Sequence, residues 1–367
     1  MKKQVLFTIL AMLVSVSAFS HNIAVQNADG VTIYYNYMNN GTELAVTYQG
    51  SDYNSYSGNV VIPASVTYTG KTYPVTSIGY TAFYQCSSLI SVEIPNSVTI
   101  IGGSAFSGCE SLTSVTIPNS VTSIGGSAFG GCSGLTSVTI PNSVTSIGGG
   151  AFNHCYGLTS IEIPNSVTSI GKEAFYQCSG LTSISVESGN EKYDSRNNCN
   201  AIIETASNTL ITGCKNTTIP NSVTSIGYEA FSGCKSLTSI TIPNSVTRIE
   251  GWAFEGCSGL TSIEIPKSVT SIGGGAFEGC TGLKNLTIHN NRPPVADSNI
   301  TSQEVYDSCV LYVPEGSENA YYVADGWKYF KNIKTIGVIE KVPQDVNGDG
   351  IVDTQDVLEI YKYIQEH

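Results

Sequence analysis

Apolar and polar residues alternate in one short unit that recurs along most of the chain. In the copy at residues 112–132, Leu112, Val115 and Ile117 point inward and the residues between them point outward, which is the periodicity of a strand. Pro118 ends this strand because proline has no N–H to donate to a ladder. A second short alternation, a glycine turn and an apolar stripe complete the unit. The pattern predicts short strands joined by tight turns.

The unit recurs along the sequence with a constant period of 23. Its last apolar position is a cysteine in every copy: Cys86, Cys109, Cys132, Cys155 and Cys178, then Cys234, Cys257 and Cys280. A period of 23 lies within the range of leucine-rich repeats, whose single units are too small to bury their own apolar side chains. Stacking pairs each strand with its neighbours and covers the open faces. The sequence therefore predicts a β-rich leucine-rich-repeat solenoid of the α/β horseshoe class.

The repeat resembles that of the BspA-like and treponemal leucine-rich-repeat surface proteins. The family pattern of Leu-x-x-Ile-x-Ile-Pro, then Val-x-x-Ile-Gly, Ala-Phe and Cys is matched almost residue for residue over about residues 60–335. The resemblance implies display at the cell surface and attachment to host proteins or to other cells, with ligands that differ among members.

The repeats are expected to be flanked by other segments, because the ends of an open solenoid need caps. The predicted segments are a signal peptide at 1–20, an N-terminal β cap at 21–84, leucine-rich repeats at 85–291 with an insertion at about 187–217, a C-terminal cap at 292–337, and a linker with a small helical calcium repeat at 338–367.

The insertion is expected to contain a hairpin. The spacing between cysteines rises to 56 from Cys178 to Cys234, which is one repeat of 23 plus 33 more. Within this interval, residues 201–204 and 209–212 have strand character and flank a polar turn. Two interpretations stay open: a tolerated interruption of the solenoid, or a projecting loop that helps to bind a ligand.

The two caps differ in composition. At the N-terminal end, residues 31–35 and 44–48 flank Asn39-Asn40-Gly41, which predicts a hairpin. Ten of the 21 tyrosines lie in residues 31–84. Such tyrosines either cover apolar faces of the cap or stack on sugars. At the C-terminal end, residues 310–314 predict a last strand, followed by an aromatic-rich segment that closes the core.

The first residues have the features of an export signal. Lys2 and Lys3 precede an apolar run over residues 5–16, and small residues at 18–20 offer a cleavage site before His21. The run is too short to cross a bilayer as a mature helix. No cysteine lies at the cleavage point, so a lipid-anchored protein is disfavoured. We therefore expect a secreted or cell-surface protein without a transmembrane segment.

The charge of the chain excludes several classes of partner. Only 13% of the residues are charged, and the net charge of −12 becomes −14 when Lys2 and Lys3 leave with the signal. An acidic surface repels the phosphates of nucleic acids and anionic lipids. Nucleic acid is therefore not an expected partner.

The C-terminal segment carries the spacing of a calcium loop. Oxygen ligands are predicted from Asp345, Asn347, Asp349, the backbone carbonyl of Ile351, Asp353 and Asp356. Gly350 permits the sharp bend at the sixth position of the loop. Four carboxylates this close together repel one another unless a cation neutralises them. Calcium is thus the one cofactor that the sequence predicts.

The calcium loop resembles a single dockerin-like EF-hand repeat. Its closing residue is Asp356 rather than the glutamate of a sensor EF-hand, and an apolar stripe at helical spacing follows it. Dockerins carry two such repeats and bind a cohesin on a scaffold, whereas only one copy is present here. The resemblance implies calcium binding, and it leaves a cohesin-like scaffold open as a partner.

Catalytic chemistry is not indicated by the reactive residues. Asn153-His154-Cys155 places a thiol beside an imidazole, but Cys155 occupies the repeated core position. Equivalent cysteines in stacked coils have parallel side chains, a poor geometry for disulfides, so we expect a ladder of buried thiols. A bridge between Cys199 and Cys214, which lie outside the repeat, stays open. We expect no enzymatic activity.

The outward strand positions form the predicted binding face. They are Ser91, Glu93, Ser114, Thr116, Ser137, Thr139, Ser160, Glu162, Ser239, Thr241, Ser262 and Glu264. The expected function is adhesion to, or recognition of, an extracellular protein, other cells or a glycan. The alternative is a non-catalytic, dockerin-like component of an extracellular assembly that degrades polysaccharides. Because the face lacks the aromatic and arginine anchors of strong interfaces, its hydroxyls could also simply satisfy one another.

Overall fold

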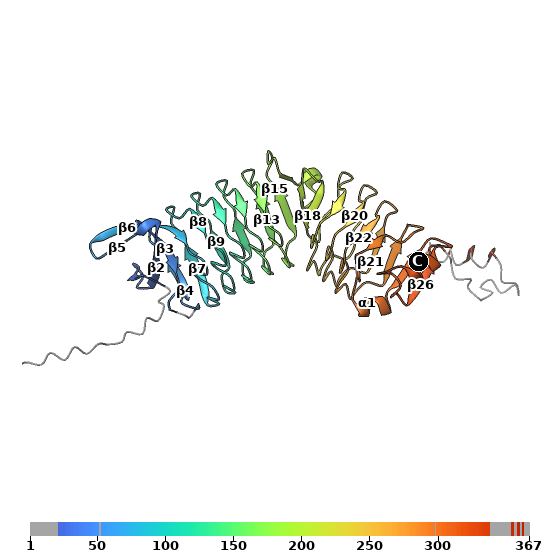
Figure 1. Cartoon of the computed structure of the whole chain (residues 1–367), viewed down its shortest axis with the longest axis horizontal. Coiled ribbons are helices and arrows are strands. Elements are labelled where there is room, and N and C mark those ends of the chain that lie inside the picture. Colours follow the sequence, from blue (N-terminus) through green and yellow to red (C-terminus); the bar gives the residue numbers. More distant parts are fainter. Residues whose placement is uncertain are drawn as a thin grey trace, which may run out of the picture.

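The computed structural model describes residues 21–50, 53–297 and 299–337, together with 354–355, 358–359 and 362. Over the continuous ranges the chain winds into a β-solenoid shaped as an arc, with the N-terminal strands at one end and the C-terminal helices at the other (Figure 1). The solenoid predicted from the 23-residue period is confirmed. No helix among the described residues is long and apolar enough to cross a membrane.

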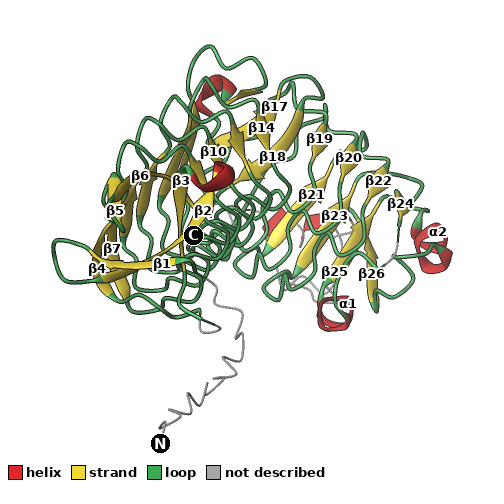
Figure 2. Cartoon of the chain, turned by 60° about the vertical axis from the view of Figure 1, so that its left-hand side comes forward, coloured by secondary structure: helices red, strands yellow, loops and turns green. Residues whose placement is uncertain are grey.

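Most coils contribute one strand to each of two layers (Figure 2). The first layer holds β4 (Gly58–Val61), β7 (Leu89–Glu93), β9 (Ser114–Thr116), β11 (Ser137–Thr139), β13 (Ser160–Ile163), β15 (Ser183–Val186), β21 (Ser262–Ile265) and β23 (Asn285–Ile288). The second layer holds β8 (Ile100–Ile101), β10 (Ser123–Ile124), β12 (Ser146–Ile147), β14 (Ser169–Ile170), β19 (Ser225–Ile226), β20 (Arg248–Ile249), β22 (Ser271–Ile272) and β24 (Val295–Ala296). Where repeat strands pair, they pair in parallel and in register; the second layer is continuous from β8 to β14, whereas the first layer is divided into the separate sheets β4–β7, β9–β11, β13–β15 and the sheet that contains β21 and β23.

The N-terminal end is closed by antiparallel strands. The predicted hairpin is present: β2 (Thr32–Met38) and β3 (Glu43–Thr47) pair across the turn η1 (Asn39–Gly41), with β1 (Ile23–Gln26) on the outer edge. A second hairpin joins β5 (Ser65–Tyr68) to β6 (Lys71–Ile78). The strand β6 then pairs in parallel with both β3 and β8, so the hairpins continue directly into the second layer.

The C-terminal end is closed by two short helices and two strands. They are α1 (Gln303–Ser308), β25 (Val310–Val313), α2 (Glu318–Val323) and β26 (Asn332–Thr335). The strands extend the first layer in parallel beyond β23. Tyr321, Trp327 and Phe330 are buried against the last coils. The last strand predicted at 310–314 is therefore confirmed as β25.

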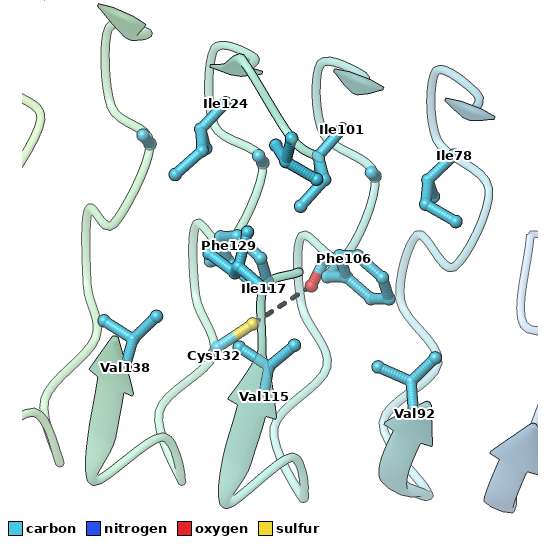
Figure 3. Packing of buried hydrophobic residues seen from close by; sticks show 14 of the residues in the cluster. Ile78, Val92, Ile101, Phe106, Val115, Ile117, Ile124, Phe129, Cys132 and Val138 are labelled. Atoms are coloured by element: carbon cyan, nitrogen blue, oxygen red, sulfur yellow. Dashed lines mark hydrogen bonds between the residues drawn. The ribbon is translucent and has the colours of Figure 1, made fainter. Parts of the chain in front are cut away.

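The core lies between the two layers and repeats its contacts from coil to coil. Valines of the first layer and isoleucines of the second point toward each other, with phenylalanine and cysteine between them (Figure 3). Phe106 and Phe129 stack at 5.2 Å between ring centroids, with an interplanar angle of 4°. Stacked ring pairs contribute about 0.5–1.5 kcal/mol each beyond their burial. The solenoid is thus stabilised by contacts between equivalent side chains of successive coils.

The cysteines form the predicted ladder of buried thiols. All 11 are free and buried. The Cys132 thiol donates to the carbonyl oxygen of Phe106 at 3.1 Å, and Cys109 and Cys155 make the same contact one coil away on either side. Burial raises the pKa of Cys155 to about 12, so its thiol stays protonated. Cys199 and Cys214 are both free thiols, so the bridge between them is absent.

Glycine is required where successive coils approach most closely. A Cβ atom on Gly125 would lie 2.5 Å from the backbone nitrogen of Gly103, and one on Gly148 would lie 2.4 Å from that of Gly126. Real Cβ atoms do not come so near to backbone, so any larger residue would push the coils apart. The glycine of the repeat therefore sets the spacing that the phenylalanine stack needs.

The insertion joins the second layer instead of projecting from it. The predicted hairpin forms from β17 (Ala201–Glu204) and β18 (Thr209–Gly213), with β16 (Tyr193–Asp194) and the turn η2 (Arg196–Asn198) before it. The strand β18 pairs in parallel with β19, so Leu210 takes the place beside Ile226 that a repeat isoleucine would occupy. No ladder joins β14 to this hairpin among the described strands. The second layer is therefore interrupted between β14 and β16.

Candidate functional site

The predicted binding face lies on the first layer of the solenoid. Its serines, threonines and glutamates alternate with buried valines and isoleucines on β9, β11, β13 and β21. Ser137 pairs with Ser114 in the ladder, and Thr139 pairs with Thr116. The structure thus brings predicted face residues of successive coils side by side in rows. All of them are exposed except Ser91, which is half-buried.

The hydroxyls of this face do not satisfy one another. Among the described residues, no side-chain hydrogen bond is formed by Ser114, Thr116, Ser137 or Thr139. Ser91 is an exception, since its hydroxyl donates to Oδ1 of Asn59 at 2.7 Å. The face therefore offers a series of hydroxyl donors and acceptors to solvent or to a ligand.

Threonines elsewhere in the same repeat behave differently. The Thr145 hydroxyl donates to the carbonyl oxygen of Thr122 at 3.2 Å, and Thr168 donates to Thr145 in the same way. A second row, beside the first layer, runs from Thr136 to Thr182 through 3.2 Å contacts of the same kind. These hydroxyls tie each coil to the one before it. The repeat thus separates threonines that hold the stack from hydroxyls that are free for contact.

Two hollows lie on the predicted face. One, of about 560 Å³, is lined by Ser137, Thr139, Ser160 and Glu162 of the predicted set, and by Glu187. The other, of about 620 Å³, is lined by His289 and by four residues of the predicted set that follow the insertion: Ser239, Thr241, Ser262 and Glu264. His289 Nε2 lies 3.2 Å from Glu264 Oε2. Sequence reasoning found these residues but not the hollows, which arise from the curvature between coils.

One part of the predicted face differs from expectation. Ser239 and Thr241 were expected on a strand, but residues 237–243 form none. The next coil carries β21, which pairs with β23 on its far side only. Among the described strands, the first layer also lacks a ladder between β7 and β9 and between β11 and β13, so such breaks are not confined to the insertion. Ser239 and Thr241 are nonetheless exposed and line the second hollow.

The tyrosines of the N-terminal end divide into buried and exposed groups. Tyr56 packs on Phe83 at 4.5 Å between ring centroids and so ends the phenylalanine stack. Its hydroxyl donates to the Thr47 carbonyl and accepts from the Tyr34 N–H. Tyr80, in contrast, is 72% exposed and lines a shallow hollow of about 380 Å³. The buried rings close the core, and the exposed ones leave the sugar-stacking interpretation open.

The thiol–imidazole pair at residues 154–155 is not assembled for catalysis. Cys155 donates to a backbone carbonyl inside the core, while Nδ1 of His154 lies 2.8 Å from the Tyr156 hydroxyl at the surface. The two side chains therefore face different environments. The predicted calcium ligands Asp345, Asn347, Asp349, Ile351, Asp353 and Asp356 lie outside the described residues, as does the signal peptide at 1–20.

A site that the sequence pattern did not reveal lies at the insertion. A cavity of about 270 Å³ opens between the end of β14 with the turn that follows it, β18, and the turn at 227–230 that follows β19. Glu229 lines it, and burial, together with the charges of Glu173 and Glu255, raises the pKa of this carboxyl to about 7, while a hydrogen bond from Tyr228 opposes the rise. The only sequence signal was the long interval between Cys178 and Cys234, which marks the break but not the cavity.

Comparison with known proteins places this geometry in a family. A family model described as the BspA type leucine-rich repeat region matches residues 76–203 and 208–310, with six copies. The chain belongs to this family. The gap between the two matched segments lies in the turn of the β17–β18 hairpin. The match begins at residue 76, inside the segment expected as a cap, because Ile78 and Phe83 already follow the repeat.

Solved structures of bacterial proteins share the fold. A leucine-rich cell surface protein from Faecalibacterium prausnitzii is 27% identical, with a TM-score of 0.50 over 86% of this chain and 95% of that chain. A leucine-rich repeat protein from Bacteroides ovatus is also 27% identical, with a TM-score of 0.54; the match covers 83% of this chain and 75% of that chain. The pneumococcal vaccine antigen PcpA shares the fold, with 18% identity and a TM-score of 0.53. The match covers 87% of this chain and 100% of that chain. A search of the curated proteins finds no match.

Proposed function

We propose that this BspA-type chain is a non-catalytic binding protein of the cell surface or the extracellular space, which holds a protein or glycan ligand on the Ser/Thr face. Here the Ser/Thr face means the outward residues of the first layer named above. The observation that carries the proposal is the contrast between two sets of hydroxyls. Thr122, Thr145 and Thr168 are used up in coil-to-coil hydrogen bonds, while Thr116 and Thr139 are exposed and unbonded.

The chemistry of the face supports a polar ligand that spans several coils. Each hollow combines serine and threonine hydroxyls with a carboxylate, Glu162 in one and Glu264 in the other. Such groups bind hydroxyl-rich or amide-rich surfaces through many weak hydrogen bonds. Repetition from coil to coil adds these contacts within one molecule, so affinity grows with the number of coils engaged. The surface description of the F. prausnitzii relative agrees with an external location.

A binding array of extracellular matrix proteins and glycans tests this function. We expect a ligand whose affinity falls when Thr139→Ala and Glu162→Ala are combined in the first hollow. Glu110→Ala serves as the matched control, because Glu110 is an exposed glutamate in a turn away from the face. A ligand that binds the double variant and the control equally would show that another surface is used, and would contradict the assignment of the face.

The calcium tail remains a separate proposal, supported by the spacing of Asp345, Asn347, Asp349 and Asp353 in the sequence. Under this proposal, calcium orders the loop at 345–356, and the tail attaches the solenoid to a scaffold. Titration of calcium into the full chain and into an Asp345→Asn, Asp349→Asn variant tests it. We expect heat with the parent chain and little with the variant. Equal heat from both, or none from either, would contradict it.

A further inference from the structure

The phenylalanine stack is open at the insertion. It runs without a break from Phe83 to Phe175 and is rebuilt from Phe231 to Phe277. Phe231 is covered by β18, where a Cβ on Gly213 would lie 2.2 Å from Cε1 of its ring. Phe175 has no such cover: it is 6% exposed, whereas Phe152 one coil earlier is 0% exposed. The uncovered ring forms part of the wall of the 270 Å³ cavity.

The cavity has an apolar floor. Phe175, Cys178 and Leu181 line it from the first stack, and Ile211 lines it from β18. All three residues of the first stack are slightly exposed, while Cys155 and Leu158, one coil earlier, are not. Apolar surface left open in this way favours an apolar occupant, because its burial releases water. The cavity, at about 270 Å³, is slightly smaller than the roughly 300–1,000 Å³ of drug-sized ligand sites, so it suits a small molecule.

The walls of the cavity are acidic. Four glutamates line it, Glu173, Glu204, Glu229 and Glu250, against the single cation of Lys172. Two of the four already have partners: Glu250 pairs with Arg248 at 2.9 Å, and Glu204 accepts from Ser207 at 2.5 Å. Glu229 receives a hydrogen bond from Tyr228, but its Oε2 atom is buried and has no hydrogen-bond partner among the described residues. A buried carboxylate oxygen without a donor is costly, so a donor from a ligand would be favourable.

We propose that this cavity binds a small organic ammonium ion, with its apolar body against Phe175 and Ile211 and its ammonium group paired with the carboxylate of Glu229. A bare metal ion fits less well, since calcium takes six to eight oxygen ligands and no group of three or more metal-ligating side chains exists among the described residues. Tyr176 and Tyr228 also line the cavity, and aromatic rings attract cations. This site is separate from the Ser/Thr face and goes beyond the proposed function.

Titration calorimetry on the full chain tests the proposal with phenethylamine as the probe. Its matched controls are 2-phenylethanol, which keeps the apolar body without the charge, and calcium chloride, which keeps a charge without the body. We expect heat from the amine and binding at least about tenfold weaker for the alcohol. Equal binding of both would overturn the proposal. Heat from calcium chloride that is lost in Glu229→Gln would assign the cavity to an inorganic cation and overturn it as well.

Two variants locate the binding. Glu229→Gln keeps the shape of the side chain and removes its charge, so amine affinity should fall about tenfold or more. Ile211→Trp fills the cavity and should abolish binding, which provides a second route if one variant folds poorly. Glu110→Gln, an exposed glutamate elsewhere, should bind like the parent chain. Unchanged affinity in Glu229→Gln, or heat from a lysine-containing peptide but not from the amine, would overturn the proposal.

Discussion

The coils before the insertion and the junction at the insertion use the same side chains with different results. From Phe83 to Phe152 each ring is covered on both faces, each cysteine donates to the carbonyl of the coil before it, and the core is closed. At the junction the same residue types, Phe175 and Cys178, border a cavity. The repeat therefore closes its core only where another element covers each open face, as a neighbouring coil does for Phe129 and β18 does for Phe231.

The junction replaces core packing with polar contacts across the break. The Tyr176 hydroxyl donates to Oε2 of Glu255 at 3.0 Å, and the Ser232 hydroxyl donates to the same oxygen at 2.8 Å. Gln177 extends this network through Nε2, which lies 3.2 Å from the Ser232 hydroxyl. These bonds join residues that come before the insertion to residues that come after it. Polar groups at a repeat boundary are thus used both for cohesion and for a ligand-sized opening.

The largest expected loss of stability comes from removing one phenylalanine ring, either in the regular coils or at the junction. Phe129→Ala should lower the free energy of unfolding by about 3–5 kcal/mol, because it leaves a cavity between two stacked rings. Phe175→Ala should cost about 1 kcal/mol less, since one face of that ring already borders open space. Urea denaturation followed by circular dichroism measures both. Equal losses would show that the cavity is filled by neighbouring side chains in solution.

A smaller effect is expected from cutting the polar network of the junction. Tyr176→Phe removes the donor to Glu255 and should destabilise the junction by about 1 kcal/mol, since the acceptor is charged but partly solvated. Hydrogen exchange should report faster opening of residues 201–213 than of residues 114–124. Tyr322→Phe is the matched control, because Tyr322 is an exposed tyrosine of α2, at the C-terminal end of the solenoid. Uniform acceleration along the chain would mean that the network does not act locally.

Substituting a threonine that bonds to the preceding coil should lower stability, whereas substituting an exposed threonine of the Ser/Thr face should weaken ligand binding. Thr145→Ala removes a coil-to-coil hydrogen bond and should cost about 0.5 kcal/mol. Thr139→Ala removes an exposed hydroxyl without a partner and should change stability by less than that, while it weakens ligand binding. Thermal denaturation of the two variants, beside the parent chain, gives the comparison. A larger loss from Thr139→Ala would show that the hydroxyl is used in the stack.

The smallest effect is a pH dependence located at the junction. The pKa of Glu229 is raised from 4.5 to about 7 in the folded chain, so between these values the folded state binds more protons than the unfolded state. The contribution of Glu229 to stability is therefore complete below about pH 4.5 and is lost as the pH rises through about 7. Glu229→Gln should remove this part of the slope in urea titrations between pH 5 and 8. An unchanged slope would assign it to other groups.

Much of the fold followed from the sequence because the repeat is local. The 23-residue period placed β9 to β14, the buried thiols and the outward rows correctly, since each coil repeats the contacts of the coil before it. The hairpin at 201–213 was also predicted from its own residues. The strand expected at Ser239 was wrong, because residues 237–243 form no ladder with a neighbouring coil. The alternation of apolar residues predicts which side chains face inward, but it does not predict whether a ladder forms.

What the sequence alone determined is the unit: which residues face inward, where each coil turns, and that the units must stack. Only the tertiary structure decided how the stack is interrupted. It placed the insertion hairpin in the second layer, left one face of Phe175 uncovered and brought Glu173, Glu229 and Glu255 together. The physical reason is distance along the chain. Contacts within one period recur and are visible as a pattern, whereas contacts across the insertion occur once and have no pattern to reveal them.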